Sequence, residues 1–337
     1  MGIKFAPLNV PLERRLQTAS VAFTMLFFPL GGPIFLMITI YVLLFTKFWW
    51  LIAIYLTWMF LLDWKIEERG GRESKLIKFS PVCKYLLDYF PIRVNRSPWV
   101  EFKKDKNYLL CCFPHGVLAL SQFNVFGNGF SEFNEYFPDH KVRVCTLKQN
   151  FYMPIYREAI LAMGTCSASK ESIQYLLNQP GGGHAAALVV GGVAEVYYAE
   201  PRKYKLVLKN RKGFVKIAIQ SGSPLVPVFS FGETDLFDQC RNPKLKIIQE
   251  KVRKLIGLAP VVSSGRGILQ YSFGIIPHRR PITVLVGPPI EVEKNEHPSM
   301  EEVDKYHQLF IDELITMFEK NKHLYIEDSE DIHIELV

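Results

Sequence analysis

Charged residues are almost absent from the first part of the chain. Residues 16–46 form one uncharged run and residues 48–62 form a second, with a single lysine between them. A helix needs about 20 apolar residues to cross the hydrocarbon core of a bilayer, and the first run is long enough. Pro29 and Pro33 lie inside that run, where proline kinks or breaks a helix. The pattern predicts either two spanning helices joined near the lysine or a membrane-embedded hairpin bent near Gly31-Gly32. Two buried core helices of a soluble protein are the alternative.

Basic residues flank both ends of this uncharged region. Arg14 and Arg15 precede it, and further lysines and arginines follow it at Lys65, Arg69, Arg72, Lys75 and Lys78. Positively charged flanks stay in the cytosol, so we expect both ends to be cytosolic and the connection to be buried or lumenal. The first run is too long for the apolar core of a cleaved signal peptide. The expected division is a short cytosolic N-terminus at residues 1–15, a membrane hairpin at 16–62, a cytosolic globular domain at 63–326 and an acidic tail that frays at 327–337.

From residue 63 onward, short apolar runs alternate with longer amphipathic stretches. The apolar runs are bounded by glycine or proline and predict strands at residues 108–113, 187–190, 225–230 and 282–286. The amphipathic stretches predict helices at residues 156–163, 172–177, 213–221 and 300–318. Strands that alternate with helices are typical of an α/β architecture, in which helices cover a sheet.

Composition excludes several classes of protein. Hydrophobic residues make up 49% and charged residues 22% of the 337 positions, which excludes a disordered chain. The formal net charge of +7 is too small for a dedicated nucleic-acid binder, but it suits partners that carry phosphate groups. None of the six cysteines forms a C-x-x-C pair or has zinc-ligand spacing with a histidine. We therefore expect neither a metal site nor a disulfide framework.

His115 is the first candidate for chemistry. It lies in a turn directly after the predicted strand 108–113, and open α/β sheets bind ligands beyond the carboxyl ends of their strands. Pro114 restricts the backbone before the histidine, and Gly116 permits a close approach after it. Histidine is the usual general base near neutral pH. The alternative is a turn histidine that contacts only water.

Two glutamates follow later strands. Glu195 comes shortly after Gly191 and Gly192, so its carboxylate could orient His115, contact an acceptor hydroxyl or cap the next helix. Glu233 also lies just past a predicted strand. Two carboxylates and one histidine beyond different strands suggest a common site.

A basic segment stands at the start of the predicted helix 213–221. Arg211 and Lys212 precede the helix, and Gly213 begins it. The N-terminus of a helix combined with basic side chains favours an anion. The alternative is a solvated basic face, but an apolar strand follows directly, so we expect an anion site.

Several short motifs, taken in order, resemble the diacylglycerol acyltransferase type 2 family, which includes monoacylglycerol and wax-alcohol acyltransferases. The resemblance runs from about Phe45 to the C-terminal helix. The family's active-site motif is usually His-Pro-His-Gly, whereas here Phe113 occupies the first position; plant members carry a glutamate there. The other pieces are Leu62-Asp63-Trp64, Gly70-Gly71-Arg72, Tyr89-Phe90-Pro91, Met153-Pro154, Arg157-Glu158, Val190-Gly191-Gly192 with Glu195, Arg211-Lys212-Gly213-Phe214, Leu225-Val226-Pro227, Ser230-Phe231-Gly232-Glu233, Gly265-Arg266-Gly267 and Pro281-Ile282-Thr283.

The resemblance implies a fold and a reaction. The expected fold is a glycerolipid-acyltransferase-like mixed sheet with flanking helices, preceded by a transmembrane or membrane-embedded helical hairpin. The expected reaction moves an acyl group from acyl-CoA to diacylglycerol and yields triacylglycerol and free coenzyme A. Monoacylglycerol or a long-chain alcohol is the alternative acceptor. A non-catalytic lipid-binding member of the family is the alternative of another class, because Phe113 replaces the first histidine.

The resemblance also implies surroundings and residue roles. We expect the endoplasmic reticulum membrane and lipid droplets as location, membrane lipid as a partner, a homo-oligomer as one form, and no cofactor, since acyl-CoA is a substrate. His115 is expected to act as general base, with Glu195, or in second place Glu233, orienting the histidine and stabilising its imidazolium. The expected substrate-binding residues are Pro114, Gly116, Gly191, Gly192, Arg211, Lys212 and Gly213. Backbone N–H groups near Gly116 or Gly191-Gly192 are expected to bind an oxyanion, and the basic pair is expected to bind the phosphates of coenzyme A.

Overall fold

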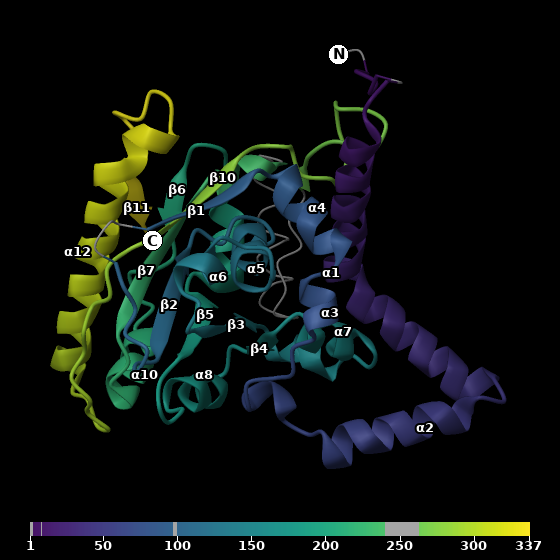
Figure 1. Ribbon diagram of the computed structural model, residues 1–337, viewed down its shortest axis with the longest axis horizontal. Helices are drawn as coiled ribbons and strands as arrows, with labels where there is room; N and C mark the ends of the chain where they lie inside the picture. The colour runs from purple at the N-terminus through teal and green to yellow at the C-terminus, as the bar shows by residue number, and fades with distance from the viewer. Residues whose placement is uncertain (1–2, 8, 97–99, 240–262) are drawn as a thin grey trace.

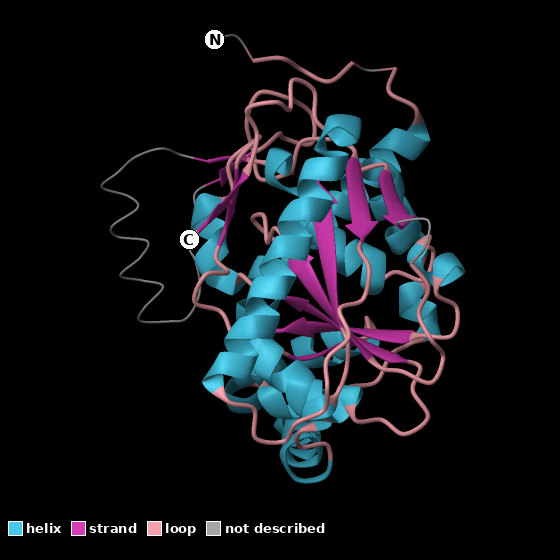
Figure 2. Cartoon of the chain, turned by 90° about the vertical axis from the view of Figure 1, so that its left-hand side faces the viewer, coloured by secondary structure: helices cyan, strands magenta, loops and turns pink. Residues whose placement is uncertain are grey.

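A mixed sheet of seven strands forms the centre of the protein (Figures 1 and 2), in a computed structural model that describes residues 3–7, 9–96, 100–239 and 263–337. The strand order is β1-β10-β7-β2-β5-β3-β4. The last five are mutually parallel, whereas β10 runs antiparallel to β7 and pairs in parallel with β1. The predicted mixed α/β sheet is therefore confirmed. The strands span Ile92–Arg96 (β1), Tyr108–Phe113 (β2), Lys141–Thr146 (β3), Thr165–Ser167 (β4), His184–Val189 (β5), Leu225–Phe231 (β7) and Ile282–Val286 (β10).

Helices cover both faces of this sheet. One face carries α1 (Leu12–Phe45), α4 (Pro81–Tyr89) and α5 (Leu120–Phe126). The other carries α8 (Lys170–Leu177), α10 (Gly213–Ser221) and α12 (Met300–Tyr325). The smaller elements are α3 (Lys75–Lys78), α6 (Phe133–Tyr136), α7 (Tyr156–Ala162), α9 (Gly192–Glu195) and the pair β8 (Asp238–Gln239) and β9 (Ser263–Ser264).

Strand β2 shows how the sequence builds two cores at once. Leu110 and Cys112 pack in the cluster that contains α1, α4 and α5. Leu109, Cys111 and Phe113 pack in the cluster that contains α8, α10 and α12. Successive side chains of a strand point to opposite faces, so a strand buried on both faces reads as an uninterrupted apolar run.

Two apolar helices occupy the uncharged N-terminal region. α1 runs from Leu12 to Phe45 through Pro29 and Pro33, and Figure 1 shows it bending along its length, as prolines inside a helix cause it to do. The chain reverses at residues 46–48 and returns as α2 (Trp49–Thr57), which a π-helical turn extends. By length and composition both helices could cross a membrane. The reversal lies near the lysine, as in the first of the two predicted forms.

The glycine pair inside α1 packs against the body and does not bend the chain into a hairpin. Gly31 and Gly32 are buried, and a Cβ at Gly31 would lie 3.0 Å from Cδ2 of Tyr156. A Cβ at Gly32 would lie 3.3 Å from Cγ of Met153. The alternative of a hairpin bend at this pair is therefore wrong, because the helix continues and uses the glycines for close contact.

Beyond Gly32, exposed apolar side chains indicate association with a membrane; they include Met37, Tyr41, Leu44, Phe45 and Trp49.

The acidic C-terminal segment does not fray. Residues Ile334–Leu336 form β11, which pairs in parallel with β6 (Tyr204–Leu206). Glu335 forms an ion pair of 2.7 Å with Lys205 of β6. The prediction of a loose acidic tail is therefore wrong, because the apolar residues between the acids pack against the core cluster and Glu335 pairs with a lysine.

Candidate active site

Three loops that carry predicted site residues meet at one edge of the sheet. β7, β2 and β5 are neighbours and run in parallel, so their carboxyl ends lie side by side. His115 follows β2, the Gly191–Gly192 pair follows β5 and leads to Glu195, and Glu233 follows β7. The structure brings these residues together at the edge where open α/β sheets bind ligands.

Glu195 holds the turn that presents His115. Its Oε1 accepts a hydrogen bond from the backbone N–H of His115 at 2.6 Å, and its Oε2 accepts one from the backbone N–H of Val207 at 2.9 Å. Burial raises the pKa of Glu195 to about 7, and the two N–H groups and the charge of Arg211 act against this rise. Both carboxylate oxygens therefore serve the backbone. Glu195 thus orients His115 through the main chain, and the predicted stabilisation of the imidazolium stays a prediction.

Glu233 closes the turn from the other side. Its oxygens accept hydrogen bonds from the backbone N–H groups of Leu120 at 3.0 Å and Ser121 at 2.8 Å, at the start of α5. Burial raises the pKa of this carboxyl to about 7 as well. Gly116 has a φ of 60°, and a Cβ there would lie 2.6 Å from Oε1 of Glu233. The residue after the histidine must therefore be a glycine, for reasons of both backbone and space.

The imidazole of His115 is partly exposed and is neutral at physiological pH. Its Nδ1 lies 3.3 Å from the carbonyl oxygen of Gly116. A carbonyl only accepts, so Nδ1 carries the proton and Nε2 keeps its lone pair. The surrounding atoms exclude most water, and this desolvation lowers the pKa of His115 to about 4. A neutral imidazole with a free nitrogen is the form that a general base requires.

The two basic residues of the predicted anion site, Arg211 and Lys212, lie in different surroundings. Arg211 is exposed and acts electrostatically on Glu195, so it lies on the active-site side. Lys212 forms an ion pair of 2.6 Å with Asp304 of α12. Gly213 begins α10. The structure therefore leaves Arg211 as the basic residue next to the turn, whereas the lysine is held by a carboxylate.

Comparison with known proteins identifies the family of this chain. The model of the diacylglycerol acyltransferase family matches residues 41–336. The chain belongs to this family. Bovine 2-acylglycerol O-acyltransferase 1 is 40% identical over 96% of this chain and 97% of its own length. Diacylglycerol O-acyltransferase 2 of Dictyostelium discoideum is 38% identical over 95% and 96%, and human acyl-CoA wax alcohol acyltransferase 2 is 37% identical over 88% and 90%.

This diacylglycerol acyltransferase family member carries Phe113 two residues before His115, and the structure shows where that side chain goes. Phe113 is the last residue of β2 and is fully buried. Its ring centroid lies 6.1 Å from that of Phe310 on α12, inside the apolar cluster on that face. The phenylalanine thus fills a core position, and the turn that holds His115 is complete without a second histidine.

Residues of other family motifs connect the apolar N-terminal helices to the globular domain. Arg157, which is 2% exposed, forms ion pairs with Asp63 at 2.8 Å and with Glu158 at 3.1 Å. Arg72 pairs with Asp63 at 2.6 Å and also with Glu158. Tyr55 of α2 donates a hydrogen bond of 3.2 Å to Glu158. Sequence reasoning missed this network, although Asp63, Arg72, Arg157 and Glu158 all belong to the motifs that carry the family resemblance.

Gly191 provides a direct test of the Glu195 contact. A Cβ at this position would collide with Oε2 of Glu195. We expect Gly191→Ala to destabilise the protein by about 1–3 kcal/mol, as overpacking does. Thermal unfolding in micelles measures the effect. Gly213→Ala is the matched control, because a Cβ there has nothing within 4 Å; equal stability of the two variants would contradict the contact.

Proposed function

We propose that the protein is an acyl-CoA-dependent O-acyltransferase of neutral-lipid synthesis that esterifies diacylglycerol to triacylglycerol and releases coenzyme A. The observation that carries the proposal is the state of His115. Its imidazole is neutral, has a free Nε2 and stands on a turn fixed by two buried carboxylates. Membership of the diacylglycerol acyltransferase family supports the choice of substrates.

The proposed reaction proceeds through a tetrahedral intermediate. Nε2 of His115 removes the proton of the acceptor hydroxyl while the hydroxyl oxygen forms a bond to the thioester carbon. The intermediate collapses, the carbon–sulfur bond breaks, and the imidazolium returns the proton to the thiolate of coenzyme A. General-base assistance of this kind contributes about 10²- to 10⁴-fold in rate. The backbone N–H groups near Gly191 and Gly192 would bind the oxyanion, at roughly 3–4 kcal/mol per donor.

The remaining residues position these groups. Glu195 and Glu233 are positioning residues, since both bind backbone N–H groups around His115. Arg211 would contact the phosphates of coenzyme A, while Lys212 would have to leave Asp304 to join it. The reaction uses no cofactor and no metal step, because the thioester already carries an activated acyl group.

The two apolar helices suit substrates that dissolve in a membrane. The hairpin would place the body at the leaflet that contains diacylglycerol, while coenzyme A remains in water. We propose the cytosolic face of the endoplasmic reticulum, and lipid droplets, as the location, because triacylglycerol carries no charge and stays in the bilayer. A homo-oligomer remains a prediction.

A monoacylglycerol acceptor is the second candidate. The observation that favours it is the bovine 2-acylglycerol O-acyltransferase 1, which at 40% identity is as similar to this chain as the diacylglycerol acyltransferases. A long-chain alcohol is supported in the same way by the wax alcohol acyltransferase at 37%. The groups around His115 serve chemistry that all three acceptors share.

Microsomes from a host without neutral-lipid acyltransferases would separate these candidates. Labelled oleoyl-CoA is supplied with diacylglycerol, with monoacylglycerol or with hexadecanol. We expect label in triacylglycerol above the other esters. Label found chiefly in diacylglycerol would show that monoacylglycerol is the acceptor, and label found chiefly in wax ester would show that a long-chain alcohol is. In either case the proposed acyl transfer would still hold. No labelled ester from well-expressed protein would refute the proposal and favour a non-catalytic lipid-binding protein.

A further inference from the structure

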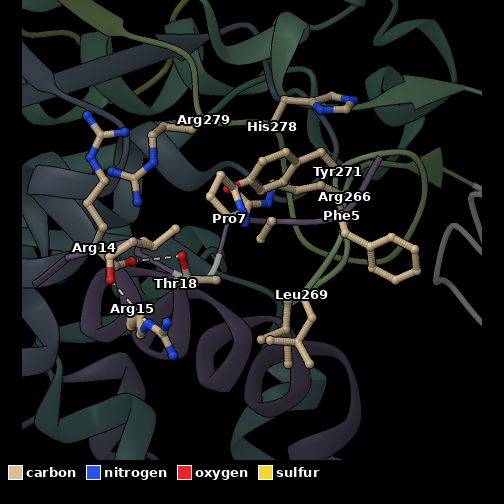
Figure 3. A pocket seen from close by; sticks show the side chains of 13 residues that line it. Phe5, Pro7, Arg14, Arg15, Thr18, Arg266, Leu269, Tyr271, His278 and Arg279 are labelled. Atoms are coloured by element: carbon tan, nitrogen blue, oxygen red, sulfur yellow. Dashed lines mark hydrogen bonds between the residues drawn. The ribbon is translucent and has the colours of Figure 1, made fainter. Parts of the chain in front are cut away.

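A cavity of about 850 Å³ lies beside the start of α1, away from the residues assigned to catalysis (Figure 3). Its walls come from residues 5–7 and Val10 near the N-terminus, the first turns of α1 and the segment 266–279. The N-terminal residues are fastened to that segment, because Ala6 donates a backbone hydrogen bond of 2.9 Å to Leu269 and Phe5 bridges to Gln270. The cavity is therefore built by segments that are far apart in the chain.

Arginines from these segments converge on the cavity. Arg14, Arg15, Arg266 and Arg279 all line it, and Figure 3 shows Arg14 and Arg279 side by side with Arg266 near Tyr271. The guanidinium of Arg266 lies 4.3 Å from the ring centroid of Tyr271. Stacking on an aromatic ring leaves the edge of a guanidinium free to donate hydrogen bonds.

The positive charges of Arg14, Arg266 and Arg279 are not balanced by nearby carboxylates in the part of the chain that the structure describes. The ion pairs of those residues include none from Arg14, Arg266 or Arg279 to an acidic side chain. Burial lowers the pKa of Arg279, and the charges of Arg14 and Arg266 lower it further. Like charges held this close favour an anion between them.

The rim of the cavity is apolar and exposed. Phe5 is 69% exposed and Leu269 is 72% exposed, although both are large hydrophobic side chains. Exposed apolar residues of the rim and of the neighbouring outer face of α1 continue this surface; they are Leu12, Leu16, Phe23, Leu26, Ile268, Phe273 and Ile275. The rim therefore joins the face of α1 that leads to the membrane helices, and Figure 1 shows α1 beside the segment after residue 262.

We propose that this cavity binds the phosphate of an anionic phospholipid from the leaflet that α1 contacts. Guanidinium groups bind phosphate oxygens in bidentate pairs. Apolar side chains around a basic site enter the acyl region of a leaflet while the arginines remain at the depth of the headgroups. None of the residues assigned to the acyl transfer lines this cavity, which favours a phospholipid over acyl-CoA as the source of the phosphate. The inference does not depend on the proposed reaction.

Lipid binding by the purified full chain in non-ionic micelles tests this site. Native mass spectrometry would compare dioleoyl phosphatidic acid with dioleoyl phosphatidylcholine, which has the same chains and no net charge. We expect preferential binding of phosphatidic acid, weakened at least about tenfold by Arg14→Gln/Arg266→Gln, since each charge-assisted hydrogen bond contributes strongly. Arg279 is left in place because it packs on Tyr89 and donates to Gln17.

Two further variants serve as controls for this experiment. Arg96→Gln/Arg202→Gln removes the same charge at exposed positions outside the cavity and should bind as the wild type does. Arg14→Lys/Arg266→Lys retains the charge but loses the bidentate guanidinium fork, so it should bind phosphatidic acid more weakly than the wild type and more tightly than the glutamine variant. If the glutamine variant fails to fold, a lysine variant that binds phosphatidic acid as tightly as the wild type would contradict the site. Equal binding of both lipids, equal loss in the control variant, or displacement of the lipid by free coenzyme A would each overturn the proposal.

Discussion

Replacing His115 with alanine is expected to lower turnover of oleoyl-CoA and diacylglycerol by about 10²- to 10⁴-fold, the contribution of a general base. The loss should appear in kcat, because Nε2 acts on the hydroxyl proton during the chemical step and is not a major binding contact. The backbone hydrogen bond from residue 115 to Glu195 does not need the side chain, so the turn should persist. Initial rates with purified protein in micelles measure the effect.

The control for this variant is His297→Ala. His297 is exposed and precedes α12, far in sequence from the turn, so turnover should stay at the wild-type level. Thermal unfolding of both variants separates a chemical loss from a folding defect. Turnover of His115→Ala above roughly a tenth of the wild-type value would exclude a histidine base.

Replacing Arg157 with methionine is expected to lower the free energy of unfolding by about 3–5 kcal/mol, as the loss of one partner from a buried ion pair does. Asp63 would lose one of its two arginines, and Glu67 would lose the guanidinium that lies 3.8 Å away. Both carboxylates are largely buried, so water cannot replace the arginine. Denaturant unfolding in micelles measures the change.

An exposed ion pair provides the comparison. Arg93 pairs with Glu132 at 2.7 Å, but the arginine side chain is 71% exposed. Arg93→Met should therefore cost less than about 1 kcal/mol. If Arg157→Met cost no more than Arg93→Met, the network between the hairpin and the body would not stabilise the fold.

Regular patterns in the sequence predicted the central elements correctly. β2, β10 and α10 have the predicted boundaries, β5, β7, α7 and α8 differ by one to three residues at one or both ends, and α12 extends seven residues beyond its predicted end. These strands are buried on both faces and so appear as unbroken apolar runs. β3 was missed because Lys141 and Arg143 interrupt its apolar residues, and Arg143 is satisfied by Glu73 at 2.6 Å, a contact that no local pattern reveals.

The sequence by itself determined the two long apolar N-terminal helices, the α/β class and the edge of the sheet at which His115 stands. These properties follow from the spacing of apolar residues and from the turn residues next to each strand, which are local. Only the tertiary structure decided that Glu195 holds the backbone of His115 and that Glu233 holds the start of α5, across separations of 80 and 113 residues. It also decided that Arg14, Arg266 and Arg279 share one cavity. The physical reason is that a hydrogen bond or a charge interaction depends on distance in space, and packing alone sets that distance between remote segments.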